Sequence, residues 1–277
     1  MIVIRTWLVL AVLCSGTARG AEPTCLKDSP SPCYSPASIV NASNATPGPF
    51  APNSVISIYG TSLSYFTQAL TDSNLKPCGT SLLPARCFDL SQDLNGVKVY
   101  VQNQPVPVLF VSPTQVNFLM SSVERPGPVT VRVVNNGKSG PDSTVTLVDA
   151  APALFSMAGG YVIAQDVKFN LLTADAPAHA GDTVVVYLTG LGQTSPNPAV
   201  GEIPNYAATM LAFASLKVTL NGTAVDREMI KYAGLTPGCG GLYQINLLLP
   251  KGTGDDPEIQ VTAGNLAAQT GLKLPLR

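Results

Sequence analysis

The sequence predicts an all-β chain made of two tandem β-sandwich domains, and two observations lead to this prediction. Gly and Pro are abundant, at 24 each, while charged residues make up only 12% of the 277 residues, which is typical of short strands joined by many turns. In addition, the segment 53–63 (NSVISIYGTSL) reappears loosely as 181–191 (GDTVVVYLTGL). Tyr59 and Tyr187 thus lie 128 positions apart, a separation of domain size.

A second match supports the same duplication. Gln115-Val-Asn117 returns as Gln244-Ile-Asn246, at a displacement of 129 positions. Two matches at nearly one offset indicate two related domains in tandem rather than a solenoid of small units.

The N-terminus predicts export. Arg5 precedes an apolar run at 7–13, and small residues follow up to Gly20. This run is too short for a bilayer core, which needs about 20 residues, so we expect residues 1–20 to be a cleaved secretory signal. A lipoprotein signal at Cys14 fits less well, because Leu13 stands where a small residue is needed. We expect a secreted or extracellular protein, or a periplasmic one, without a membrane span.

The charge balance argues against nucleic acid as a partner. Without residues 1–20 the formal charge is −3, from 14 basic and 17 acidic residues, and the charges are scattered. Binding to nucleic acid or anionic lipid requires clustered Lys and Arg.

Five cysteines follow the predicted signal. In an oxidising compartment, Cys25 with Cys33, and Cys78 with Cys87, are expected to form two local disulfides. Cys239 is left over, and we expect a free, partly buried thiol there. A zinc site is less well supported, because the sequence has one histidine and no Cys-x-x-Cys.

The predicted organisation has three parts after the signal. Residues 21–48 form a lead-in rich in Pro, Ser and Asn, in which residues 38–42 are able to add a strand to the first domain. Residues 49–150 form the first sandwich, which contains a disulfide-clipped insertion at 64–93. Residues 151–277 form a linker and the second sandwich.

The strands are predicted from apolar residues that alternate with polar ones between turn formers such as Asn-Gly. In the first domain this pattern predicts strands at 54–59, 97–101, 106–111, 115–119, 129–133 and 144–148. In the second it predicts strands at 183–188, 216–220, 228–232, 242–249, 258–261 and 272–274. Two further short strands, 151–155 and 161–164, are expected to bridge the sandwiches.

With these residues laid out, the chain resembles a family of uncharacterised extracellular C-terminal domains first described in acidobacteria such as Solibacter. The motifs that carry the resemblance cover nearly all of the chain after the signal, in the family's order: SIVNAS at 38–43, SVISIYGT at 54–61, VSPTQVN at 111–117, APALF at 151–155, VYLTGLG at 186–192, GLTPG at 234–238 and GLYQIN at 241–246.

The resemblance implies export from a bacterial cell, an immunoglobulin-like plan for both sandwiches and no established activity. Two features depart from the family pattern. The insertion that carries Cys78 and Cys87 is unusual, and Cys239 stands where a bulky apolar residue is expected.

The repeated Gln-x-Asn motif is the most informative polar signal. Gln115 and Asn117 share one face of their strand, as do Gln244 and Asn246, because residues two apart point to the same side. Amide groups both donate and accept, so they either tie loop backbone in place or hold sugar hydroxyls in a polar groove between the domains. The possible exposed aromatic rings for sugar binding are those of Tyr65, Phe66 and Tyr206.

Other polar groups give weaker signals. His179 is the single histidine, and the sequence contains no nucleophile motif, such as Gly-x-Ser-x-Gly, for which it could act as the base. The carboxylates Asp255, Asp256 and Glu258, like Asp89 and Asp93, lack the spacing of a calcium loop. We therefore predict no catalytic residue, no metal and no cofactor.

These observations favour a secreted, non-catalytic module for surface or matrix binding, adhesion or spacing, whose partner is an unknown protein or polysaccharide at the cell surface. A carbohydrate-binding module is the alternative. An enzyme that uses the insertion or Cys239 is a third.

Overall fold

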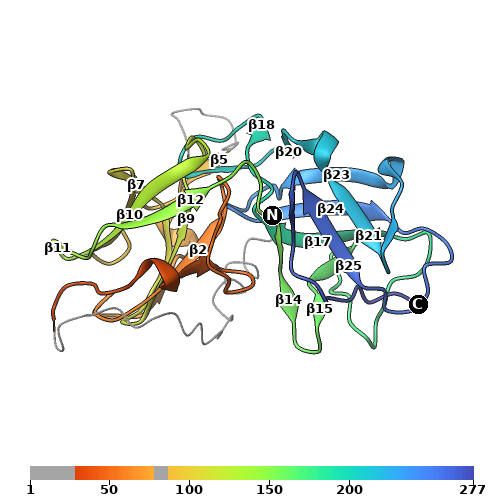
Figure 1. Cartoon of the computed structure of the whole chain (residues 1–277), viewed down its shortest axis with the longest axis horizontal. Helices are drawn as coiled ribbons and strands as arrows, with labels where there is room; N and C mark the ends of the chain where they lie inside the picture. Colours follow the sequence, from red (N-terminus) through yellow and green to blue (C-terminus); the bar gives the residue numbers. More distant parts are fainter. Residues whose placement is uncertain (1–28, 78–86) are drawn as a thin grey trace.

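The computed structural model describes residues 29–77 and 87–277, and Figure 1 shows them as two β-rich halves side by side along the long axis. The predicted signal, Cys25 and Cys78 lie outside the described residues. The helical segments of the described part are short 3-10 turns: η2 (Pro36–Ser38), η3 (Asp72–Asn74), η4 (Phe213–Ser215) and η5 (Arg227–Met229). None of the helices in this part has the length and apolar character needed to cross a membrane.

Two antiparallel sheets make up the first half. One has the order β1-β2-β9-β8-β3, with β1 (Ile39–Asn41), β2 (Val55–Tyr59), β9 (Gln115–Leu119), β8 (Val108–Val111) and β3 (Gln68–Ala69). The other has the order β11-β10-β6-β7, with β11 (Lys138–Ser139), β10 (Gly127–Asn135), β6 (Val97–Val101) and β7 (Gln104–Val106), while β12 (Ser143–Leu147) also pairs with β10.

The second half follows the same plan. Its larger sheet has the order β13-β17-β24-β23-β20-β18, with β13 (Ala153–Leu154), β17 (Thr183–Thr189), β24 (Tyr243–Leu248), β23 (Ile230–Leu235), β20 (Ala208–Met210) and β18 (Thr194–Ser195), and β16 (Ala164–Asp166) also pairs with β17. Its smaller sheet has the order β22-β21-β25-β26, with β22 (Thr223–Ala224), β21 (Lys217–Leu220), β25 (Ile259–Ala263) and β26 (Leu266–Ala267).

Two small sheets complete the structure. One is the hairpin of β14 (Ser156–Met157) and β15 (Tyr161–Val162). The other has the order β19-β5-β4 and joins β4 (Lys76–Pro77) and β5 (Cys87–Asp89) of the insertion to β19 (Glu202–Pro204) of the second half. The predicted all-β fold of two tandem immunoglobulin-like sandwiches is confirmed.

The alternating sequence produces most of these strands as expected, but the predicted strand 106–111 is divided between β7 and β8, which belong to different sheets. In β10, Val129, Val131 and Val133 are buried, while the residues between them face outward. The hairpin between β10 and β11 turns through Asn136 (φ 47°) and Gly137 (φ 80°). Two successive positive φ values are the type I′ geometry that matches the twist of paired strands, and Asn-Gly adopts it readily.

The duplication is visible in the strand register. Tyr59 pairs with Gln115 between β2 and β9, and Tyr187 pairs with Gln244 between β17 and β24. The next strand is irregular at the same place in both copies, since the β8–β9 register shifts between Val108 and Phe110 and the β23–β24 register shifts between Ile230 and Tyr232. The repeated sequence thus specifies a repeated ladder, including its bulge.

Each half has its own apolar core. Phe50, Ile56 and Phe118 are among the fully buried side chains of the first core. Leu154, Val186 and Tyr243 are among those of the second. Residues from the predicted lead-in contribute to the first core, because Tyr34 is 2% exposed and Ile39 is fully buried.

Three strand predictions from residue 151 onward are wrong in pairing or extent. The segments 151–155 and 161–164 do not bridge the sandwiches, because β13 and β16 add to β17 and β15 pairs with β14. The predicted strand 272–274 is an isolated set of bridges, in which Lys273 pairs with Tyr161 and Glu258. Short apolar segments of this kind have no local pattern that selects a partner strand.

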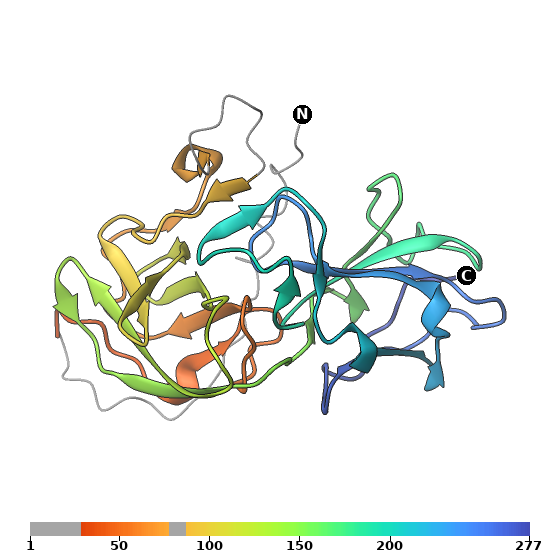
Figure 2. The ribbon, with the colours of Figure 1, turned by 90° about the horizontal axis from the view of Figure 1, so that it is seen from above.

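The insertion joins the two halves. Figure 2 shows the insertion, drawn in orange to gold, next to a teal segment of the second half. In this link β5 pairs with β19, so that Phe88 lies opposite Ile203. Ile203 is 1% exposed and belongs to the first core, although it comes from the second half of the sequence. The insertion is therefore a structural link as well as a surface loop.

Further polar contacts cross the junction. The buried Thr189 hydroxyl accepts a hydrogen bond from the Val55 amide at 3.1 Å and donates one to the Gly241 carbonyl at 2.9 Å. The Ser122 carbonyl accepts from the side-chain amides of Gln193 (3.2 Å) and Asn197 (3.1 Å).

Gly241 is required at this junction for two reasons. Its φ is +74°, and a Cβ built there lies 2.5 Å from Leu119 and 2.7 Å from Val55. We expect Gly241→Ala to lower the free energy of unfolding by about 2–4 kcal/mol, because overpacking adds to the cost of the left-handed backbone. Urea denaturation, followed by far-UV circular dichroism, measures this loss.

Gly252→Ala is the matched control. Gly252 has a φ of +76° but nothing within 4 Å of its Cβ position. This variant should lose only about 1–2 kcal/mol, from the backbone conformation alone. Equal losses in the two variants would contradict the close packing of the junction.

Candidate functional site

An open groove of about 560 Å³ lies beside the link between the two halves. Its walls come from three parts of the sequence that are far apart: the insertion and the turn after it, the β6–β7 hairpin, and Val200 of the second half. Its lining residues are Asn74, Asp89, Leu90, Ser91, Gln92, Asp93, Lys98, Tyr100, Pro105 and Val200.

Hydrogen bonds of the backbone hold these segments together. The Leu90 amide donates to the Gly201 carbonyl at 2.8 Å, and the Val108 amide donates to the Ser91 carbonyl at 3.0 Å. Asp93 shapes the turn into β6, because its carboxylate accepts from the Gly96 amide at 2.8 Å. The groove is therefore built on the sandwich and does not depend on one loop alone.

Tyr100 supplies the aromatic surface of the groove. It lies on the outward face of β6, since Val99 and Val101 point into the core. The Arg132 guanidinium lies 5.6 Å from the centre of the Tyr100 ring, a distance typical of a cation–π contact.

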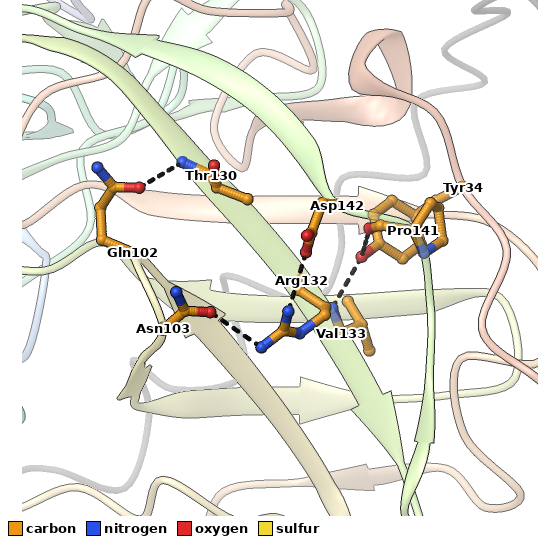
Figure 3. A network of polar contacts seen from close by, with 8 residues as sticks. All are labelled: Tyr34, Gln102, Asn103, Thr130, Arg132, Val133, Pro141 and Asp142. Carbon is orange, nitrogen blue, oxygen red and sulfur yellow. Dashed lines mark hydrogen bonds and ion pairs between the residues drawn. The ribbon is translucent and has the colours of Figure 1, made fainter.

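A polar network next to the groove fixes Arg132, as Figure 3 shows. Its guanidinium donates to Asp142 at 3.2 Å and to the Asn103 side chain at 3.1 Å. In the same view, the Tyr34 hydroxyl donates to the Pro141 carbonyl at 2.7 Å and accepts from the Val133 amide at 2.8 Å. Burial raises the pKa of Tyr34 to about 12, so this hydroxyl stays protonated at neutral pH.

Carboxylate and amide groups dominate the polar lining of the groove. Asp89, Asp93, Asn74 and Gln92 contribute them, and Lys98 is the single cationic lining residue. The Lys98 ammonium lies 3.7 Å from the Asp93 carboxylate, and both side chains are nearly half exposed. Such a pair contributes little to stability in water, so both groups remain available to a ligand.

The structure does not bring the two Gln-x-Asn pairs together. Gln115 and Asn117 lie on β9 in the first half, and Gln244 and Asn246 lie on β24 in the second half (Figure 1). In each copy the Gln side-chain amide donates to the Asn side-chain oxygen at 2.8 Å. The motif thus makes the same local contact twice.

The two copies differ in exposure. Asn117 has no exposed surface and also accepts a hydrogen bond from the Ser57 hydroxyl at 2.9 Å, while Gln115 is partly buried. Gln244 and Asn246 are partly buried as well. Asn117 is therefore inaccessible to a ligand, whereas the other three remain binding residues by prediction only.

The predicted aromatic residues lie in different surroundings. Tyr65 is 51% exposed, and its hydroxyl accepts from the Lys138 ammonium at 3.2 Å. Phe66 beside it is 61% exposed. Tyr206 is partly buried, and its hydroxyl donates to Glu202 at 3.1 Å.

The described residues include three of the cysteines, Cys33, Cys87 and Cys239. Cys239 is a free, partly buried thiol in the turn between β23 and β24, and burial raises its pKa to about 11. Cys33 is disulfide-bonded, but its predicted partner Cys25 lies outside the described residues. The predicted link of Cys78 to Cys87 is not tested either, because Cys78 also lies outside them.

The remaining polar candidates make structural contacts. His179 is highly exposed and lies 3.7 Å from the Asp182 carboxylate. Asp256 accepts from the Tyr161 hydroxyl at 2.9 Å, and Glu258 accepts from the Gly271 amide at 2.7 Å. Among the described residues no three His, Cys, Asp or Glu side chains are placed to hold a metal ion.

Tyr100 was missed as a site residue because nothing near it in the sequence marks it. It appears as one outward residue of an alternating strand, and its groove partners Asp89 and Val200 are distant in the chain. The spacing of Asp89 and Asp93 does not fit a calcium loop, and no other sequence pattern links them to Tyr100. The position of the insertion, which the second copy lacks, was the signal that pointed to this side of the molecule.

Comparison with known protein families gives one match. The IPT/TIG domain matches residues 38–148, the part that forms the first sandwich together with its edge strand β1. No curated protein matches the chain.

Solved structures similar to this chain include two surface glycan-binding proteins and an adhesin. The SGBP-B protein of the Bacteroides ovatus mixed-linkage glucan utilization locus shares 10% identity at a TM-score of 0.32, and the match covers 91% of this chain and 47% of that one. PbSGBP-B from Prevotella bryantii shares 11% identity at a TM-score of 0.26, covering 80% of this chain and 36% of that one. The Escherichia coli adhesin FdeC shares 16% identity at a TM-score of 0.23, covering 92% of this chain and 65% of that one.

This chain spans about half of the length of the first of these proteins and about a third of the second. At such low identities and TM-scores, the likenesses carry no argument about function. The chain contains an IPT/TIG immunoglobulin-like domain at residues 38–148, and the second half repeats its strand plan.

Proposed function

We propose that this chain is a secreted, non-catalytic binding module of the cell surface or matrix, with its ligand site in the groove beside Tyr100. The observation that carries the proposal is the convergence of three distant segments, including the insertion that only the first copy has, on one open groove. The volume of the groove falls within the range of about 300–1,000 Å³ that is usual for ligand sites, and Tyr100 gives it an aromatic surface among polar groups.

The junction supports an adhesive or spacing role. The β5–β19 ladder and the burial of Ile203 in the first core join the halves through both polar and apolar contacts. Such a junction keeps the two ends of the module at a fixed separation when one end is bound. This role requires no catalytic group.

A carbohydrate ligand is the second candidate, and the groove lining favours it. The flat Tyr100 ring offers an apolar surface, while the amides of Asn74 and Gln92 and the carboxylates of Asp89 and Asp93 are able to accept hydrogen bonds from hydroxyl groups. The excess of acceptors over cations disfavours acidic sugars and phosphates.

Export, extracellular localisation and membership of the acidobacterial family of extracellular domains are part of this proposal. They rest on the signal-like residues 1–20 and on the ordered motifs of the sequence. The assignment of residues 49–150 and 151–277 to separate domains also rests on the sequence. It is supported by the two cores, with two exceptions: Ile203 belongs to the first core and Ala150 to the second.

The groove can be tested with a panel of soluble glucans, mannans and galactans in affinity gels and calorimetry. We expect Tyr100→Ala to weaken the binding of any polysaccharide that the wild type binds by at least tenfold, about 1.4 kcal/mol. The reason is the loss of the aromatic surface. The thermal midpoint should fall only slightly, because Tyr100 lies on the outward face of β6 and its removal costs the cation–π contact with Arg132, about 0.5–1 kcal/mol.

Tyr65→Ala and Gln244→Ala are the matched controls, since neither residue lines the groove. Both should bind as the wild type does. Loss of binding in these variants but not in Tyr100→Ala would place the site at the residues predicted from sequence. If no polysaccharide of the panel binds, the carbohydrate candidate is wrong.

A nucleophilic role for Cys239 can be tested by its reaction with iodoacetamide in the folded protein. Because burial raises the pKa from 9.0 to about 11, the thiol is protonated at pH 7 and should be almost unreactive. The rate of labelling should rise about tenfold for each pH unit until the pH approaches 11, as intact-protein mass spectrometry will show.

The same shift affects stability. Since the pKa of the folded state lies above that of the unfolded state, the contribution of Cys239 to stability is present below pH 9 and is lost as the pH rises towards 11.

Protein denatured in urea at pH 8 is the positive control for the labelling of Cys239. Rapid labelling of the folded protein at pH 7 would instead favour the enzyme hypothesis.

A further inference from the structure

The first half contains a parallel bridge between the segment that follows the lead-in and the end of its last strand, β12. Phe50 lies opposite Leu147 in this bridge. The Phe50 amide donates to the Thr146 carbonyl at 3.0 Å, and the Phe50 carbonyl accepts from the Val148 amide at 2.8 Å. On its other side β12 pairs with β10, and that pairing is antiparallel.

The second half repeats this bridge. Ala178 lies opposite Leu276 in a parallel bridge. The Ala178 amide donates to the Pro275 carbonyl at 3.0 Å, and the Ala178 carbonyl accepts from the Arg277 amide at 2.9 Å. Ala178 follows Phe50 by 128 positions, the offset of the duplicated strands, so the bridge belongs to the repeated plan. We call the two contacts the terminal bridges.

The central residues of the terminal bridges are buried. Phe50 and Leu147 belong to the first core, and Ala178 and Leu276 belong to the second. Water therefore has little access to the bonded groups of Phe50 and Ala178. A hydrogen bond in such surroundings is stronger than one at the surface.

The direction of the chain decides how such a bridge responds to tension. Tension pulls the segment before Phe50 towards the N-terminus and the segment after Val148 towards the C-terminus. Because the two segments run in parallel, they slide past each other, and both hydrogen bonds are loaded at the same time. An antiparallel hairpin pulled at its two ends loses its bonds one after another instead.

We propose that this chain bears tension between its two ends and that the terminal bridges resist it. The earliest described residues (red) lie in one half in Figure 1, and the C-terminal end lies at the far side of the other half. Tension between them therefore acts along the long axis and crosses both halves. The proposal rests on the adhesive role of the proposed function, because a module between a surface and a bound partner is pulled when the partner moves.

The segment through which tension enters the first half is anchored as well. The buried Tyr34 hydroxyl is bonded to the Pro141 carbonyl and the Val133 amide, as Figure 3 shows. Beside it, Cys33 and Thr61 exchange two backbone hydrogen bonds of 2.9 Å. A pull on the lead-in is therefore passed to β10 and to the end of β2.

Unfolding of the mature chain at constant force, with tags at both ends, tests this proposal. Val148→Pro removes the amide that donates to the Phe50 carbonyl, and Arg277→Pro removes the equivalent amide of the second half. The half that carries the substitution should unfold at least about fivefold faster under force, because a loaded backbone bond is lost. Gly-Ser residues inserted after Gly252, where space is open, lengthen only the extension of the second half and so identify its unfolding event.

Leu211→Pro is the matched control. It also removes one backbone bond, from the Leu211 amide to the Gln193 carbonyl at 2.9 Å, but at an exposed residue outside the terminal bridges. Its urea midpoint should fall about as far as those of the other two variants, while its unfolding rate under force stays close to that of the wild type. Circular dichroism checks that all three variants fold.

Two results would overturn the proposal. One is an unchanged rate of unfolding under force in folded Val148→Pro and Arg277→Pro. The other is an equal acceleration in Leu211→Pro, which would attribute the effect to a general loss of stability. The experiment needs no ligand, and none of the three residues lines the groove beside Tyr100. Failure of this proposal is therefore distinguishable from failure of the ligand site.

Discussion

The buried hydroxyl of Thr189 is the interaction on which the arrangement of the two halves depends. It is bonded to the Val55 amide in the first half and to the Gly241 carbonyl in the second, in a place without access to water. A buried amide without an acceptor costs about 1–3 kcal/mol, so this single side chain fixes the approach of two backbones. Gly241 allows that approach because it has no Cβ. The pairing of β19 with β5, which places Val200 in the wall of the groove, lies at the same junction.

The duplication explains the plan of the molecule, and the differences between the copies explain its surfaces. Both copies keep the Tyr–Gln pairing and the bulge in the neighbouring strand. The second copy covers the outer side of its sheet, where Tyr187 packs with Phe155 and Ile163 and donates its hydroxyl to Gln165. The first copy instead uses its insertion to contact β19. The conserved ladder is therefore a scaffold, on which each copy has added a different surface.

The local sequence predicts those strands and turns whose pattern lies within one short segment. Alternation predicted β6, β9 and β10, because one face of each strand must be buried, and Asn136-Gly137 predicted a hairpin. It was not sufficient for β5 and β19, since strand partners more than a hundred residues apart leave no periodic signal in either segment. For the same reason, the sequence does not predict the groove around Tyr100. The spacing of the Gln-x-Asn motif predicts a repeated polar element, but it does not predict the hydrogen bond between the Gln and Asn side chains of each copy.

The strongest argument about function comes from residues that the fold does not need. Thr189 and Gly241 are explained by the junction, and the Gln-x-Asn pairs by their own hydrogen bonds. Tyr100 and Phe169 are different, because neither side chain belongs to a core. Phe169 is 74% exposed on a strained backbone, whereas Tyr100 is half-buried on the outward face of β6, where it lines the groove. The Arg132 guanidinium lies 5.6 Å from the centre of the Tyr100 ring and is itself held by Asp142 and Asn103. The fold therefore presents the Tyr100 ring to the groove in one orientation, which is what a ligand site requires.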